Sequence, residues 1–384
     1  MLVAGEASGD QLGAGLARAL RARLGAGVRF VGVGGSAMAG EGVESPFEIA
    51  QLSILGLFEG LAAYRRVVRL SDQTAALAQR EQPDVAILID SWGYTLRVAQ
   101  RLRRLRPRMP IVKYVGPQVW ASRPGRARTL ARTVDHLLSI HAFDAPHFER
   151  EGLSVTFVGN PALARDLAAA DGARFRRSVG LGDDARLLLV APGSRPGEVA
   201  RLAPPFGEAL SVLKASCPDL QVVVPVAETV ADAVRAAAAA WPVQPYFVEG
   251  EERRADAMKA ADVALACSGT LTIELALAGC PMVVAYRLGA MTHVVLQRII
   301  RTRYVTLFNI AAGREVAPEL IQDDCTGPKL AAAVFARLSD PVVRERQRAE
   351  QWAALDLMGR GGPDPSEAAA DAVLKLLADR RRSA

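Results

Sequence analysis

Short apolar runs alternate with amphipathic segments along the whole chain, and this alternation constrains the fold more than any other feature. Most of the runs are continuous blocks of Val, Ile, Leu and Ala, which is typical of parallel strands covered by helices on both faces. The predicted strands after a first one at residues 1–4 are Val28–Val33, Val85–Ile89, Ile111–Val115, Leu137–Ile140, Val155–Val158, Leu187–Ala191, Gln221–Val226, Val263–Ala266 and Met282–Ala285. Helical spacing with arginine-rich polar faces marks Leu12–Arg23, Ser71–Arg80, Thr95–Arg106 and Thr229–Ala240. The pattern predicts a doubly wound α/β fold.

The alternation is interrupted by Gly159–Asp184, a polar stretch rich in Asp, Arg and Ala. A length of 384 residues suits two domains better than one or three. We therefore predict a Rossmann-like domain at 1–165, a second at 185–340, and helices at 341–384 that pack back across the domains. Because open α/β sheets bind ligands at the carboxyl ends of their strands, we expect the two domains to face a cleft.

Composition narrows the function classes. Half of the residues are hydrophobic and 23% are charged, which excludes a disordered chain. The net charge of +6 suits a phosphate-bearing ligand or an anionic membrane surface, but scattered arginines and 5% aromatic residues do not favour nucleic acid. The four cysteines and four histidines show no metal-ligand or disulfide spacing, so we expect no metal and a reducing, cytoplasmic location. No charge-free apolar run approaches the ~20 residues that span a bilayer.

Two features of the first half are candidates for a site. Gly5–Asp10 follows the first strand and opens a helix, so its backbone can approach a phosphate. The alternative is a tight turn in which Ser8 or Asp10 caps the helix. Asp90 stands at the carboxyl end of a buried strand, where a carboxylate can accept a proton from a sugar hydroxyl. The alternative for Asp90 is a cap on the helix that follows.

Two loops of the second half resemble ligand-binding turns. Gly193–Glu198 follows a strand, and Ser194 and Arg195 are placed to contact a diphosphate; a plain turn with Pro196 in the first helical turn is the alternative. Cys267–Glu274 joins a strand to a helix whose free N–H groups suit a phosphate.

In the second of these loops, Glu274 lies one turn after Thr270, too late for a capping box. A carboxylate there can accept both hydroxyls of a ribose. The alternative is an acid that is favoured only by the helix dipole.

Two further segments allow more than one interpretation. Asn309–Gln322 has the pattern of a strand, a loop and a helix, and its polar residues either face a cleft or lie in a solvated loop. Ile49–Phe58 carries no charge, and Arg65, Arg66 and Arg69 follow. This run is either a buried helix or an apolar patch with a basic rim that suits acyl chains or a membrane surface.

The motifs resemble a known family when they are taken together and in order. They are AGEASGD (Ala4–Asp10), VGVGG (Val31–Gly35), ILGLFE (Ile54–Glu59), the strand end at Asp90, YVGPQVWA (Tyr114–Ala121), PGSRPGEV (Pro192–Val199), SGTLTIE (Ser268–Glu274), CPMVVAYR (Cys280–Arg287) and FNIAAGREVAPELIQ (Phe308–Gln322). The likeness runs over nearly the whole chain. The sequence is similar to the lipid-A-disaccharide synthases, which are glycosyltransferases of the GT-B fold.

The resemblance implies a reaction. The family moves 2,3-diacylglucosamine from its UDP donor to 2,3-diacylglucosamine 1-phosphate and releases UDP, as a step of lipid A (lipopolysaccharide) biosynthesis in Gram-negative bacteria. It implies an inverting mechanism, no cofactor, and a peripheral place on the cytoplasmic face of the inner membrane. The family includes dimers, so a homodimer stays open for this chain.

The resemblance also implies residue roles. Asp90 matches the proposed base. The donor or UDP side comprises Ser194, Arg195, Ser268, Gly269, Thr270, Glu274, Asn309, Arg314 and Glu315. The acceptor loop comprises Glu6, Ser8 and Asp10, and the acyl or membrane patch comprises Ile54, Leu55, Leu57 and Phe58.

The chain departs from the family pattern after Asp90. The family usually shows Pro-Asp-Phe-Asn there, and this chain has Trp92-Gly93-Tyr94-Thr95, so a second acid is absent. Two alternatives to the transferase remain. One is a UDP-sugar 2-epimerase of the same fold, which would want extra acids and a histidine near the sugar. The other is a non-catalytic protein that binds a nucleotide or a membrane.

Overall fold

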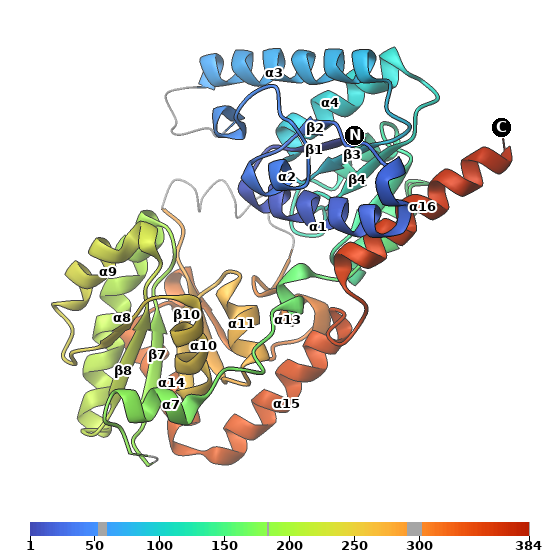
Figure 1. The fold of residues 1–384 in the computed structure, drawn as a ribbon. Helices are drawn as coiled ribbons and strands as arrows, with labels where there is room; N and C mark the ends of the chain where they lie inside the picture. Colours follow the sequence, from blue (N-terminus) through green and yellow to red (C-terminus); the bar gives the residue numbers. More distant parts are fainter. Residues whose placement is uncertain (53–59, 183, 290–301, 384) are drawn as a thin grey trace. The chain divides into compact units, whose positions relative to one another are not determined.

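The computed structural model describes residues 1–52, 60–182, 184–289 and 302–383 (Figure 1). The predicted acyl patch lies outside them, since it consists of Ile54, Leu55, Leu57 and Phe58. The chain forms two compact units. Unit 1 comprises residues 1–161 and 361–384, and unit 2 comprises residues 162–360.

Unit 1 is a three-layer α/β unit around six parallel strands in the order β2-β1-β3-β4-β5-β6. Leu2 and Ala4 pack on the face covered by α1 and α16, while Val3 packs on the face covered by α3 and α4, because alternate side chains of a strand point to opposite faces. The strands are β1 (Leu2–Ala4), β2 (Gly32–Val33), β3 (Ala86–Ile89), β4 (Ile111–Tyr114), β5 (His136–Ser139) and β6 (Ser154–Phe157). The helices are α1 (Ala7–Leu24), α2 (Ser36–Gly40), α3 (Gly60–Glu81), α4 (Trp92–Leu105), α5 (Gly125–Ala131), α6 (Ala145–Glu149) and α16 (Pro365–Ser383).

Unit 2 repeats the architecture with the strand order β12-β11-β10-β7-β8-β9, again all parallel. Every residue of β7 is buried, as a strand covered on both faces requires. The strands are β7 (Leu187–Ala191), β8 (Gln221–Pro225), β9 (Tyr246–Val248), β10 (Val263–Cys267), β11 (Met282–Tyr286) and β12 (Glu319–Ile321). The helices are α7 (Gly172–Ser178), α8 (Pro196–Ser216), α9 (Ala231–Ala238), α10 (Glu251–Ala260), α11 (Leu271–Leu277), α13 (Leu307–Ala312), α14 (Gly327–Ser339) and α15 (Pro341–Leu357).

The predicted α/β pattern is confirmed, and one local prediction is wrong. Within Asn309–Gln322 the order is helix, loop and strand, not strand, loop and helix. Helix α13 ends at Gly313, which has a φ of 65° that glycine adopts without strain, and β12 then joins the edge of the sheet beside β11. The short apolar run Phe308–Ala312 suits either a helix or a strand, so the pattern alone did not decide it.

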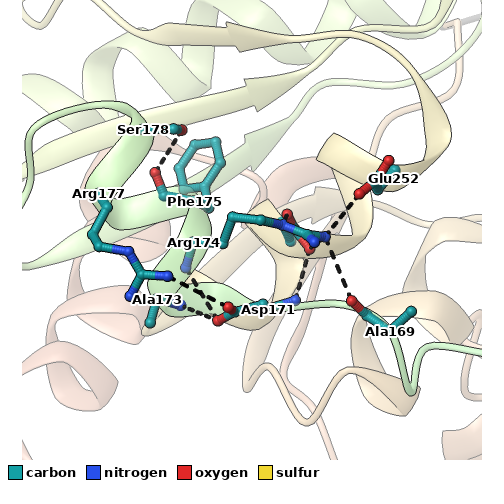
Figure 2. Close-up of polar contacts among 9 residues, drawn as sticks. Ala169, Asp171, Ala173, Arg174, Phe175, Arg177, Ser178 and Glu252 are labelled. Carbon is teal, nitrogen blue, oxygen red and sulfur yellow. Dashed lines mark hydrogen bonds and ion pairs between the residues drawn. The ribbon is translucent and has the colours of Figure 1, made fainter.

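The polar stretch between the two series of strands contains helix α7, and a network of charges fixes it to α10 (Figure 2). Asp171 caps α7 by accepting hydrogen bonds from two backbone N–H groups of its first turn. Arg174 pairs with Asp256 at 2.6 Å and with Glu252 at 3.0 Å. The hydrogen bonds from Arg174 lower the pKa of Asp256, because they favour its charged form.

Each sheet has one point at which the strand order reverses, and ligands of open α/β sheets bind at the carboxyl ends of the strands there. In unit 1 the reversal lies between β1 and β3, whose last residues, Ala4 and Ile89, are paired. In unit 2 it lies between β7 and β10, which pair through Ala191 and Ala266. The loops after β1 and β3 therefore lie next to each other in unit 1, and the loops after β7 and β10 lie next to each other in unit 2.

Candidate active site

Asp90 lies in a strained turn at the reversal point of unit 1. Asp90 has a φ of 46° and Ser91 a φ of 43°, a left-handed conformation that costs a residue with a side chain about 1–3 kcal/mol. The backbone N–H of Asp90 donates to the Tyr114 carbonyl at 2.9 Å, and its carbonyl accepts from Thr95 Oγ1 at 2.7 Å. Ser91 is the N-cap of α4 and no side chain caps that helix, so the capping alternative for Asp90 is wrong.

A buried lysine supports this turn. The Lys113 side chain lies in β4, is 3% exposed, and donates from Nζ to the Asp90 carbonyl and to Thr95 Oγ1, the latter at 2.8 Å. Burial lowers the pKa of Lys113 to about 7, although the charges of Asp90 and Glu6 oppose the change. The sequence analysis missed Lys113. A charged residue inside the apolar run Ile111–Val115 was the signal.

The acceptor loop predicted at Gly5–Asp10 divides into exposed and buried residues. Glu6 and Ser8 are exposed, and Ser8 Oγ lies 3.5 Å from Asp90 Oδ2. Asp10 is 4% exposed and caps the start of α2 instead of α1. Its carboxylate accepts hydrogen bonds at 2.7–3.1 Å from the backbone N–H groups of Gly35, Ala37 and Met38. The structure thus brings Ser8 to Asp90 and uses Asp10 to hold the neighbouring VGVGG loop.

A pocket with a volume of about 650 Å³ opens beside the Asp90 turn. Its walls include Glu6 from the acceptor loop, Ser91 from the turn, and aromatic and cationic side chains of α3 and α4. Sequence reasoning found Glu6 but none of the α3 and α4 residues, which are Tyr64, Trp92, Tyr94 and Arg97.

The two candidate loops of unit 2 meet at a second pocket, which has a volume of about 210 Å³. Gly193 and Ser194 come from the loop after β7, and Ser268, Gly269 and Thr270 come from the loop after β10. Small residues at this position leave the backbone accessible to a ligand. The two loops therefore meet within unit 2.

Arg195 and Glu198 shape the first of these loops. Pro196 stands in the first turn of α8, as the turn alternative predicted. The Glu198 carboxylate accepts hydrogen bonds from the backbone N–H groups of Ser194 and Arg195 at 3.1 and 3.3 Å. The Arg195 side chain is 79% exposed and bonds Glu198 at 3.2 Å, so it is free to reorient toward an anion.

Glu274 lines the same pocket and is held by two arginines. Its side chain is 13% exposed and pairs with Arg165 at 2.7 Å and with Arg254 at 3.4 Å. Helix α11 begins after Thr270, as predicted. Arg165 and Arg254 escaped the sequence analysis because they are far from Glu274 in the chain and no local pattern marks them.

The remaining predicted donor residues do not line this pocket. Asn309 is fully buried, and its side chain bonds the loop before β12 through the backbone of Val316 and Ala317. Arg314 pairs with Glu350 at 3.1 Å, and Glu315 is exposed. In unit 2, Asn309 thus stabilises a loop, and the other two lie on the surface.

The described residues contain neither a metal-binding cluster nor a helix that could span a membrane. No three His, Cys, Asp or Glu side chains gather there closely enough to hold a metal ion. No helix there has the length and the apolar character that crossing a membrane demands.

Known proteins share this fold. The structure of S. aureus MnaA with UDP superposes with a TM-score of 0.62 at 15% identity, covering 96% of this chain and 93% of that one. The glycosyltransferase of kitacinnamycin gives a TM-score of 0.60 at 20% identity and covers 98% of each chain. These likenesses establish the predicted GT-B fold and, at such identities, the fold alone.

Sequence comparison identifies the family. The profile described as lipid-A-disaccharide synthetase matches residues 1–372. A lipid-A-disaccharide synthase of Rhodospirillum centenum is 45% identical over 379 residues, which are 99% of this chain and 94% of that protein. The match favours lipid A disaccharide synthesis over the epimerase alternative. The chain belongs to the lipid-A-disaccharide synthase family, and it is a UDP-sugar-dependent glycosyltransferase of lipid A biosynthesis.

Proposed function

We propose that the protein transfers 2,3-diacylglucosamine from its UDP donor to 2,3-diacylglucosamine 1-phosphate, with inversion at the anomeric carbon and Asp90 as the general base. The observation that carries the proposal is the strained, lysine-supported turn that holds Asp90 at the reversal point of its sheet. Strain of this kind persists only where surrounding contacts fix it, and it clusters at functional sites.

In the proposed reaction, the Asp90 carboxylate takes the proton of the acceptor 6-hydroxyl. The oxygen forms a bond to the anomeric carbon of the donor as the bond from that carbon to the diphosphate oxygen breaks. The departing UDP carries away the bonding electrons, so negative charge grows on the diphosphate. Backbone N–H groups at the start of α11, with the Arg195 side chain, would stabilise that charge.

The pocket of unit 2 supports the donor side of the proposal. The loops with Ser194 and Ser268–Thr270 offer small side chains and helix starts, which suit a diphosphate. Glu274 lines the same pocket, and its carboxylate can accept the two ribose hydroxyls once it exchanges its arginine contacts. One of the solved structures that share this fold, that of S. aureus MnaA, was determined with UDP.

Asp90→Asn tests the proposal. A general base contributes about 10²–10⁴-fold, so the variant should lose that much of the rate of UDP release and disaccharide formation and still bind UDP. Asp72→Asn, which alters an exposed acid on α3, is the matched control and should keep its rate. Near-normal turnover by Asp90→Asn would show that another group removes the proton.

We also propose peripheral contact with the cytoplasmic face of the inner membrane. Arg65 and Arg69 are exposed on α3, after the segment in which the sequence predicts the apolar patch. Basic side chains next to apolar ones favour anionic bilayers. Binding to vesicles that contain phosphatidylglycerol is the measurement for this contact, and its absence at low salt would contradict it.

A further inference from the structure

The pocket beside the Asp90 turn has a cationic and aromatic wall. Tyr64 and Arg97 project from α3 and α4, and Trp92 stands in the first turn of α4. The Arg97 guanidinium carbon lies 5.0 Å from the centre of the Tyr64 ring. The Arg126 guanidinium carbon lies 5.1 Å from the centre of the Trp92 ring. Each ring therefore holds a guanidinium group in place by its π face.

These two arginines have no acidic partner among the residues that the structure describes. Arg101, one turn further along α4, pairs with Asp72, whereas no carboxylate stands within 4.0 Å of Arg97 or Arg126 in those residues. Arg97 donates to the Gly93 carbonyl of its own helix. Burial lowers the pKa of Arg126, and the charge of Arg123 lowers it further. Guanidinium groups that pair with no carboxylate, and that are partly withdrawn from water, favour an anion as their ligand.

The rest of the pocket narrows the class of anion. Leu52 and Val67 are buried apolar residues of its wall, so the ligand has an apolar part as well as a charge. Glu6 is the acid of the wall and is exposed, where a carboxylate suits the hydroxyl groups of a sugar. Ser91 joins the wall to Asp90. A phosphorylated, acylated sugar meets all of these conditions at once.

We propose that Arg97, assisted by Arg126, binds the 1-phosphate of the lipid acceptor. The inference rests on the proposed function and assigns its acceptor site. A phosphate on a membrane phospholipid shares the same chemistry, and its contribution is separated by the experiment below. Trp92–Thr95, which follow the Asp90 turn, carry no acid that would pair with the guanidinium groups, so these groups are available to phosphate.

The experiment compares two acceptors, diacylglucosamine with and without the 1-phosphate. Wild-type enzyme should prefer the phosphorylated acceptor, and Arg97→Gln should raise the KM for it about 10- to 100-fold, since a hydrogen bond to a charged group is lost. The KM for the unphosphorylated acceptor and for the UDP donor should not change. Arg126→Gln should act in the same direction with a smaller effect, because Arg126 only flanks the pocket.

Arg104→Gln is the matched control, an exposed arginine on the same helix outside the pocket, and it should match wild type in every assay. Full discrimination between the two acceptors by Arg97→Gln would overturn the inference. Lost binding to phosphatidylglycerol vesicles with discrimination intact would also overturn it, and would assign the site to a phospholipid headgroup.

Calorimetric binding of the two acceptors without donor separates this inference from the proposed function. If wild-type enzyme releases no UDP, the proposed function fails. Phosphate-dependent binding that is lost in Arg97→Gln would still support the site.

Discussion

The two reversal points occupy the same place in two sheets of the same kind, yet they are built differently. In unit 1 the turn after β3 contains two non-glycine residues with positive φ, Asp90 and Ser91. In unit 2 the loop after β7 turns at Gly193, with a φ of 127°, where glycine bears no strain. In unit 1 the strained backbone costs stability and orients the side chains of the turn, while in unit 2 the glycine turn leaves the backbone accessible to a ligand. The difference suits chemistry on one side and nucleotide binding on the other.

Charge is arranged just as differently in the two units. Lys113, Arg97 and Arg126 of unit 1 have no acidic partner within ion-pair distance in the described residues, whereas Glu274 of unit 2 holds two arginines. Charges without partners respond to a ligand or to pH directly. An acid that is already paired must exchange partners before it can bind a ligand.

Replacing Lys113 gives the largest effect expected in this comparison. Lys113→Met removes a charge-assisted hydrogen bond from the Asp90 turn and should lower kcat about 10- to 100-fold with little change in the donor KM. The pKa of about 7 means that wild type loses the ammonium charge as pH rises through 7. Its rate should therefore fall above that pH, whereas Lys113→Met should be slow throughout and lack this decline.

The pH profile is the readout that a purely structural role would not move. Lys113→Arg, which stays charged, should recover part of the rate at pH 8. Lys329→Met, an exposed lysine of unit 2, should keep the wild-type profile. A wild-type decline near pH 7 that persists in Lys113→Met would show that another group titrates there.

An intermediate effect is expected from the paired acid of unit 2. Glu274→Gln leaves Arg165 and Arg254 without their carboxylate and removes the proposed ribose acceptor, so UDP affinity should fall roughly 10-fold in calorimetry. Glu251→Gln is the control, because it alters an exposed partner of the same Arg165. Equal UDP affinity in wild type and Glu274→Gln would remove the contrast between the two units.

The smallest effect is expected from two buried acids with different partners. Asp144 of unit 1 accepts hydrogen bonds from Ser139 and Trp120, and burial raises its pKa to about 6. The native state then holds a proton that the unfolded state releases above its ordinary pKa, so Asp144 destabilises the fold as pH rises through 4–6.

Asp144→Asn should therefore gain about 1 kcal/mol over wild type between pH 5 and 7.5, measured by denaturant unfolding. Asp256, whose pKa Arg174 lowers, has its pH-dependent window below that range. The stability difference between Asp256→Asn and wild type should stay constant from pH 5 to 7.5. A constant difference for Asp144→Asn as well would mean that this carboxyl is ionised in the native protein throughout.

Sequence reasoning predicted most of the strands, because buried parallel strands appear as continuous apolar runs. Which loops meet followed only from the strand order in the structure. Strand β7 begins and ends at the residues predicted for it. The edge strands β9 and β12 were missed, since most of their residues are only partly buried and neither forms a long continuous apolar run.

The candidate site was predictable in part. The loops of Asp90 and Ser268–Thr270 are marked by local spacing, whereas the partners that hold them are not. Lys113 and Arg165 act through long side chains on residues distant in sequence, and only the fold brings them there. Asp10 and Asn309 show the converse, since both are polar residues of motifs that the fold uses as internal hydrogen-bond anchors.

Because helix α16 belongs to unit 1, this unit can complete its fold only at the end of synthesis. Its Ala370 and Val373 lie in the core beside α1, and Arg23 forms ion pairs with Glu367 and Asp371. On a ribosome, α16 emerges roughly 10–40 s after residues 1–161 at ordinary translation speed, because all of unit 2 is made in between. During that interval the nascent chain exposes an uncovered apolar face, which is a natural target for chaperones.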